Sequence, residues 1–426
     1  MPERNLKSHR RARMLVATTV GVLCSFLVAC SAEVPAPAPT ALTPTATAMP
    51  TGDGVLTIGT LLPTTGAAAF LSKAQDAGVE LAVREINEAG GVNGKPVVVY
   101  HQDSGDASTT KAEGSFADLL SKSVDVVIGP SSSVLAERLL PKLMSAGMVM
   151  ISPSATSPAL STLKDNGLLF RTIPSEALEG RALASIIGKK KVALIYYSDD
   201  AGRAVRAEFS AALEKVGGEL VASEGFSTTT NDASKIVSAM SSVAPDVVVL
   251  TSPFSAMEKN KAIILALTKA KLGGAKLWLT SQNLADYSQA LPGGTLKDVN
   301  GILEGNSSDA EFQKRVKSAD PSVTDYRYAA EAYDATILAA LAAIVGGDDS
   351  GLAIASVLHK ISSTGIKCTS FGECLEVLKT RKDIDYDGIT GALAFDANGD
   401  ITSAPYGIYR YGAENKFTLV DTVTVK

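Results

Sequence analysis

The chain has 426 residues, of which 46% are hydrophobic and only 5% are aromatic, and its formal net charge is −5. This length exceeds one typical domain and indicates two domains, with enough apolar residues to build real cores. An acidic chain without a basic run is a poor candidate for binding nucleic acid, so no nucleic-acid partner is expected.

Residues 1–29 have the pattern of a signal peptide. Five basic residues between Arg4 and Arg13 precede an uncharged, mostly apolar stretch from Met14 to Ala29. That stretch is shorter than the roughly 20 residues that span a membrane, and it suits the apolar region of an export signal. The following Cys30 completes Leu27-Val28-Ala29-Cys30, which resembles the lipobox of bacterial lipoproteins. The resemblance implies cleavage before Cys30 and a lipid on its sulfur; the alternative is an ordinary signal peptide that contains cysteine.

Residues 30–53 are predicted to be the lipidated cysteine and an extended tether. Five prolines lie among alanines and threonines between Ser31 and Gly52. Such a composition cannot bury a core and favours an extended, solvated segment. No second hydrophobic stretch approaches membrane-spanning length, so the lipid is the expected anchor to the outer side of the bacterial cell membrane.

Two cysteines remain for the folded part, Cys368 and Cys374, six residues apart. Outside the cytoplasm, a disulfide that closes this short loop is the default expectation, and a metal pair is the alternative. The histidines after Cys30 are His101 and His359, and neither has a partner at zinc-ligand spacing. We therefore expect neither a metal nor a cofactor.

From residue 55 onward, short apolar strands alternate with amphipathic helices. Strands are expected at residues 55–62, 97–100, 124–128, 148–151, 192–197, 247–250 and 276–279. Helices are expected after the first strand, where apolar residues recur at helical spacing from Val79 to Ile86, and at residues 112–121, 135–146 and 326–344. Apolar strands separated by helices indicate parallel sheets covered on both faces, so the two runs predict an α/β fold with two doubly wound lobes.

The loops after two of these strands are rich in small hydroxylated residues. One is Gly129-Pro-Ser-Ser-Ser133 and the other is Ser152-Pro-Ser-Ala-Thr-Ser-Pro158. Ligands of doubly wound sheets bind at the carboxyl ends of strands, and the N–H groups at a helix start favour an anion. The two loops therefore predict a site for a small carboxylate, although Ser133 could instead cap its own helix.

Several motifs follow one another along the chain. They are Ala89-Gly-Gly-Val-Asn-Gly94, Ile128-Gly-Pro-Ser-Ser-Ser133, Ala146-Gly-Met-Val-Met-Ile-Ser-Pro-Ser-Ala-Thr-Ser-Pro158, Phe170-Arg-Thr-Ile-Pro174, Glu331-Ala-Tyr-Asp-Ala335, Tyr386-Asp-Gly-Ile-Thr-Gly391 and Phe395-Asp-Ala-Asn-Gly399. By their order and spacing, the chain from about Val55 to Val425 resembles the type I periplasmic solute-binding proteins of the branched-chain amino acid group, which serve ABC transporters. The resemblance implies two lobes joined by three hinge crossovers. Lobe 1 would hold residues 54–173 plus 305–403, and lobe 2 residues 174–304 plus 404–426.

The resemblance also implies ligand-binding residues. Hydroxyl contacts fall at Ser133, Ser154 and Thr156, and an aromatic contact falls at Tyr333.

The second half of the implied site departs from the family pattern. Gln282 stands near the position of an acidic partner for the ligand's ammonium, Ala201 replaces a tyrosine, and Leu71 replaces an early aromatic. A neutral amide binds a cation less well than a carboxylate does, although Asp199 or Asp200 could supply the charge. The solute is therefore expected to be an amino acid, an amide or another small polar metabolite such as a carboxylate.

The resulting hypothesis is a lipid-anchored, monomeric receptor that delivers a small solute to an ABC permease in the membrane. A ligand-sensing receptor without transport is the alternative. Enzymatic activity is not expected, because the sequence has no G-x-S-x-G motif, no metal cluster and no evident triad.

Overall fold

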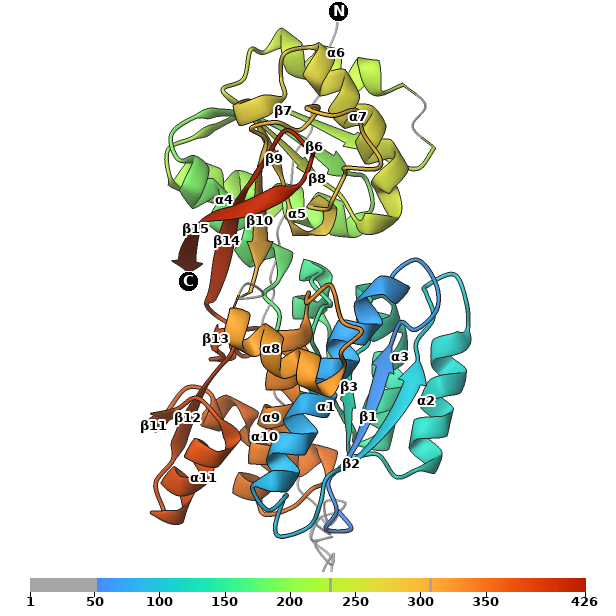
Figure 1. The fold of residues 1–426 in the computed structure, drawn as a ribbon, viewed down its shortest axis with the longest axis vertical. Coiled ribbons are helices and arrows are strands. Elements are labelled where there is room, and N and C mark those ends of the chain that lie inside the picture. The colour runs from blue at the N-terminus through green and yellow to red at the C-terminus, as the bar shows by residue number, and fades with distance from the viewer. Residues whose placement is uncertain (1–51, 230–231, 306–308) are drawn as a thin grey trace, which may run out of the picture. The chain divides into compact units, whose positions relative to one another are not determined.

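The computed structural model describes residues 52–229, 232–305 and 309–426. The predicted signal peptide, Cys30 and nearly all of the proline-rich segment lie outside the described residues. The described chain forms two α/β lobes, each built on a sheet with parallel strands (Figure 1).

The first sheet has five parallel strands in the order β2-β1-β3-β4-β5. The strands are β1 (Thr57–Leu62), β2 (Val98–Asp103), β3 (Val126–Ile128), β4 (Val149–Ser152) and β5 (Leu169–Arg171). One face packs against α2 (Lys111–Ser121) and α3 (Ser133–Ala146). The other packs against α1 (Ser72–Glu88), α9 (Ala329–Gly346) and α10 (Gly351–Ile361). Burial on both faces explains why β3 and β4 are continuous apolar runs rather than alternating ones.

The second sheet has seven strands in the order β15-β14-β10-β9-β8-β6-β7. The strands are β6 (Lys191–Tyr197), β7 (Glu219–Phe226), β8 (Val247–Thr251), β9 (Leu277–Leu279), β10 (Asn300–Glu304), β14 (Ala404–Tyr411) and β15 (Phe417–Val425). The first five are parallel to one another, β14 pairs antiparallel with β10, and β15 pairs antiparallel with β14. Its helices are α4 (Glu176–Ile187) and α5 (Asp200–Lys215) on one face and α6 (Ala233–Ser242) and α7 (Met257–Lys269) on the other.

The chain passes between the lobes three times: between β5 and α4, after β10, and before β14. After β10 it enters α8 (Ala310–Ala319), which packs on α1. The predicted α/β fold with two parallel-sheet lobes joined by three crossovers is therefore confirmed.

A small third sheet follows α10. It holds β11 (Ile366–Cys368), β12 (Ile384–Gly388) and β13 (Gly391–Ala392), with α11 (Phe371–Lys379) after β11. A disulfide joins Cys368 to Cys374, whose Cα atoms lie 5.2 Å apart, and both cysteines are buried. It ties β11 to α11.

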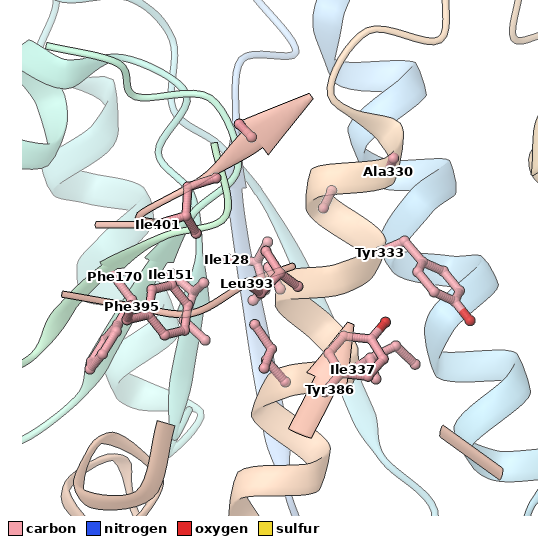
Figure 2. Packing of buried hydrophobic residues seen from close by; sticks show 14 of the residues in the cluster. Ile128, Ile151, Phe170, Ala330, Tyr333, Ile337, Tyr386, Leu393, Phe395 and Ile401 are labelled. Carbon is pink, nitrogen blue, oxygen red and sulfur yellow. The ribbon is translucent and has the colours of Figure 1, made fainter. Parts of the chain in front are cut away.

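Helix α9 corrects two sequence predictions. It begins at Ala329 and not at residue 326, because Tyr328 adopts a left-handed backbone with φ of 62°, which a helix cannot continue. It is also long and apolar enough to cross a membrane, with 18 residues and a mean hydropathy of 1.4, yet 83% of it is buried inside the protein. Figure 2 shows its side chains, among them Ile337, with those of the first sheet and Tyr386. It is the core helix of the first lobe.

The loop after β4 is held by a buried ion pair. Arg171, only 1% exposed, donates from Nε to Asp400 Oδ1 at 2.7 Å. Its Nη1 donates to the backbone oxygens of Ala155 and Ser157, at 3.1 and 2.9 Å. One guanidinium therefore fixes both the ion pair and the conformation of this loop.

We predict that Arg171→Leu lowers the free energy of unfolding by about 3–5 kcal/mol, because it leaves Asp400 without its cation in a largely buried place. Urea unfolding followed by circular dichroism measures the effect. The control is Arg203→Leu, which breaks an exposed ion pair with Asp200 and should leave the unfolding midpoint unchanged. Equal midpoints for both variants would contradict the prediction.

Candidate functional site

A cavity of about 490 Å³ lies where strand ends of the two lobes meet. On the first lobe its lining follows β1, β2, β3 and β4, and on the second lobe it follows β6, β8 and β9. Parallel strands end at one edge of their sheet, so each lobe contributes several loops to one place.

The wall from the first lobe presents hydroxyl groups. Ser133 is the first residue of α3, and its Oγ accepts from the Ser157 backbone N–H at 3.1 Å. The N-cap position of α3 is Ser132, and the bond from Ser157 uses the Ser133 oxygen as acceptor, so the hydroxyl hydrogen of Ser133 can still be donated to another acceptor. Ser154 is 8% exposed, and its Oγ has no hydrogen-bond partner among the described residues. Unpartnered buried hydroxyls are uncommon, and this one lines the cavity.

A hydrogen-bonded bridge spans the cavity from lobe to lobe. Gln282, after β9, donates from Nε2 to Thr156 Oγ1 and to Glu176 Oε1, both at 2.6 Å. Thr156 in turn donates to Glu176 Oε1 at 2.9 Å. Thr156 belongs to the first lobe, whereas Gln282 and Glu176 belong to the second, so the two walls touch directly at this point.

Two acidic side chains from the first turn of α4 line the same cavity. Burial raises the pKa of Glu176 to about 7, although the hydrogen bond from Thr156 acts in the opposite direction. Burial and the neighbouring Glu304 raise the pKa of Glu179 well above its ordinary value. Glu179 also accepts from the backbone N–H and the hydroxyl of Ser281 at 2.8 and 3.1 Å. The site thus holds an acid that titrates near neutrality.

Aromatic rings from the two lobes meet beside the cavity. Phe70, before α1, and Phe254, which lines the cavity after β8, pack edge to face with ring centroids 5.5 Å apart. The guanidinium carbon of Arg327 lies 5.0 and 5.3 Å from these two rings. Arg327 is held by Asp325, to which its Nε donates at 3.0 and 2.9 Å. We call Phe70, Phe254 and Arg327 the aromatic clasp.

The structure brings most of the expected ligand residues together. Six of them line the cavity: Leu71, Ser133, Ser154, Thr156, Ala201 and Gln282. Asp199 also lines it and accepts from the Gly202 N–H at 2.8 Å as the cap of α5. Asp200 is almost fully exposed and pairs with Arg203, so only the first of these two aspartates can reach a bound solute.

Tyr333 is placed elsewhere, which corrects the expectation for this residue. It is 1% exposed, and its hydroxyl donates to Glu85 Oε2 at 2.6 Å and accepts from Arg315 at 3.0 Å. Because α9 starts at Ala329, Tyr333 lies in its second turn and faces α1 and α8. Tyr328, immediately before the helix, lines the cavity instead.

Sequence reasoning missed Glu176 and Glu179. Ser175 caps α4 by accepting from the Ala177 N–H, and acids are common in the first turn of a helix. The sequence here is therefore typical of any helix start. Nothing local in the sequence indicates that this turn packs against a loop of the other lobe. No group of three or more His, Cys, Asp or Glu residues suited to a metal ion occurs within residues 52–229, 232–305 and 309–426.

Comparisons with known proteins agree with this architecture. The chain is 28% identical over 365 residues to the "Chemotactic signal transduction system substrate-binding protein BasB" of Halobacterium salinarum, covering 82% of this chain and 84% of that one. It is 26% identical over 367 residues to the "Leu/Ile/Val-binding protein homolog 3" of Brucella melitensis, covering 84% and 91%. The isoleucine complex of the substrate-binding protein LivJ from Streptococcus pneumoniae has a similar fold, with a TM-score of 0.67, 22% identity and coverage of 87% and 99%.

The family profile described as "Receptor family ligand binding region" matches residues 74–414, which include most strands of both lobes and the whole cavity lining from Ser104 to Tyr328. The chain therefore belongs to this family of receptor ligand-binding regions, has the two-lobe fold of type I periplasmic binding proteins, and is a binding protein rather than an enzyme.

Proposed function

We propose that this protein is a lipid-anchored, extracytoplasmic receptor that captures a small polar solute between its lobes and delivers it to an ABC importer. The observation that carries the proposal is the cavity itself, which has hydroxyls on one wall and an amide beside a carboxyl group on the other. The solute class is an amino acid, an amide or a small carboxylate.

The two walls suit opposite ends of such a solute. A ligand carboxylate fits the hydroxyls of Ser133, the first residue of α3, and of Ser154, which follows β4. At the start of α3, N–H groups and the helix dipole favour negative charge. An amide or ammonium group fits the wall that holds Gln282, Glu176 and Asp199. A solute bound in this way contacts both lobes, and a ligand that prefers the closed arrangement shifts the protein toward it.

The names of related proteins support the same function. The relative from Brucella melitensis carries the name Leu/Ile/Val-binding protein homolog, and the similar structure from Streptococcus pneumoniae is described as a branched-chain amino acid transporter substrate-binding protein. A thermal-shift screen over amino acids, amides and small carboxylates tests the proposal, because a bound ligand raises stability by RT ln(1 + [L]/Kd). If no compound raises the melting temperature, the proposed function is wrong.

A second function is sensing without transport. The relative from Halobacterium salinarum is named as part of a chemotactic signal transduction system. Uptake of a radiolabelled solute in cells that lack the gene separates the two functions. Transport predicts loss of uptake, whereas sensing predicts intact uptake and a lost behavioural response.

Replacing Ser133 or Thr156 by alanine should weaken the binding of a carboxylate solute by about 1–3 kcal/mol each, because each change removes a hydroxyl from the cavity wall. Titration calorimetry measures the loss. Ser145→Ala is the matched control, since that hydroxyl lies on the same helix as Ser133 and donates to the Pro141 oxygen. Unchanged affinity in both test variants would place the solute elsewhere.

Phe254→Ala should speed release of the solute up to about tenfold, because an aromatic pair worth about 0.5–1.5 kcal/mol no longer joins the lobes at the aromatic clasp. Stopped-flow displacement gives the dissociation rate. Leu265→Ala, which removes an exposed apolar side chain from α7, is the control and should leave this rate unchanged. A dissociation rate equal to wild type for Phe254→Ala would exclude a role for the clasp in retention.

Cys30→Ser should move the protein from the membrane fraction to the soluble extracellular or periplasmic fraction, because the lipid attachment site is lost. Fractionation followed by immunoblotting measures the distribution. Cys24→Ser, inside the predicted signal peptide, is the control and should leave the protein in the membrane fraction. Membrane retention of the Cys30 variant would refute lipid anchoring at this residue.

A further inference from the structure

We propose that the cavity selects a solute with net positive charge, such as an amino acid that carries a second ammonium group, over its neutral and anionic analogues. The inference rests on the proposed function, since it names the solute class of the same cavity. It starts from a charge asymmetry in the lining: Asp106, Glu176, Glu179 and Asp199 line the cavity, whereas none of its lining residues is a lysine, arginine or histidine.

The arginines that act on Glu176 and on the neighbouring Glu304 are already paired. Arg171 acts on Glu176 but binds Asp400, and Arg327 acts on Glu304 but binds Asp325. Within the described part of the chain, Glu176 receives hydrogen bonds only from neutral groups, the Thr156 hydroxyl and the Gln282 amide. A buried carboxylate without a counter-ion costs free energy. An ammonium group of the ligand beside Glu176 therefore stabilises the complex more than the same ion pair would be stabilised in water.

Ser154 gives an independent reason to expect a ligand with a carboxylate as well. Its hydroxyl is buried, lines the cavity and lacks a partner among the described residues. It can donate to a ligand carboxylate beside Ser133, on the wall opposite Glu176. The lining also includes the apolar residues Leu71, Val205 and Pro253, which suit an aliphatic stem. The solute that satisfies all three regions is a zwitterion with an additional cation at the end of an apolar chain.

The ionisation of Glu176 gives the proposal a pH signature. The ionisable groups that act on Glu176 come from the elements packed around it: Glu179 on α4, Glu304 on β10, Asp199 at α5, Arg171 on β5 and Tyr406 on β14. Because the pKa of Glu176 is about 7, the empty protein is destabilised by its ionisation as the pH rises through that value. A bound cation favours the ionised form and lowers this pKa. Affinity for a cation should therefore rise with pH through about 7 and be accompanied by proton release.

The test compares four probes in titration calorimetry: lysine, norleucine, cadaverine and glutamate. Norleucine lacks the side-chain ammonium, and cadaverine lacks the carboxylate. We expect lysine to bind at least about tenfold more tightly than norleucine, because a charge-assisted hydrogen bond is added. Cadaverine should bind less tightly than lysine but more tightly than glutamate. The affinity for lysine should fall between about pH 8 and about pH 6, a range in which its side-chain ammonium stays charged.

Glu176→Gln keeps the shape of the side chain and removes its charge. It should reduce the affinity for lysine about tenfold and leave the affinity for norleucine nearly unchanged. It should also abolish the pH dependence of lysine binding. The matched control is Glu331→Gln, which neutralises a buried acid whose pKa is also raised, to about 8, but which does not line the cavity. It should retain the wild-type preference. Asp199→Asn is a second test variant if Glu176→Gln fails to fold. It should also reduce the affinity for lysine more than the affinity for norleucine.

The outcomes separate the two proposals. If norleucine or glutamate binds more tightly than lysine, the charge selection is wrong and the proposed receptor function stands. If lysine binds most tightly but Glu176→Gln and Asp199→Asn keep both the preference and the pH dependence, the charge selection at this wall is wrong. If neither these probes nor any compound of the thermal-shift screen binds, both proposals fail.

Discussion

Both sheets of this protein end their parallel strands at the same cavity, and that constraint determines the composition of the site. Loops after β3 and β4 bring the hydroxyl wall, and loops after β6, β8 and β9 bring the opposite wall. Neither wall could hold a small solute alone, because each is one side of a cleft. The bridge from Gln282 to Thr156 is where these two sets of loops come into hydrogen-bonding contact.

The rigid parts of the molecule lie directly behind these loops. Arg171 ties the loop after β4 to Asp400 beside the third crossover, so a wall of the cavity and a hinge segment share one buried ion pair. Helix α9 is buried on nearly all sides and holds the first lobe together, which leaves the segment before it, with Arg327 and Tyr328, at the junction of the lobes. Movement between the lobes therefore has to occur at the crossovers, since the cores on either side are closely packed.

The sequence predicted the parts of the site that depend on local pattern. Apolar strands followed by Ser133 or Thr156 are recognisable because strand, loop and helix start are neighbours in the chain. Gln282 lines the cavity, but its partner Glu176 was not found, because that contact joins residues 106 positions apart. Tyr333 was assigned through the family resemblance, and in the structure it contacts Glu85 and Arg315 instead of lining the cavity. Tyr328 lines the cavity, and nothing in a tyrosine indicates the left-handed backbone that it adopts before α9.

The substitution at Gln282 therefore has a different meaning from the one the sequence alone suggests. A neutral amide there indicates a site that has lost its acid, whereas the structure places an acid from α4 within 2.6 Å of that amide. The acid beside this amide comes from α4 and is buried, so its ionisation depends on what lies beside it. An acid on the exposed loop at Asp200 would be screened by water and by Arg203. A buried acid distinguishes cationic from neutral solutes more strongly than an exposed acid does. A solute without a cation leaves the buried carboxylate unpaired, which costs free energy.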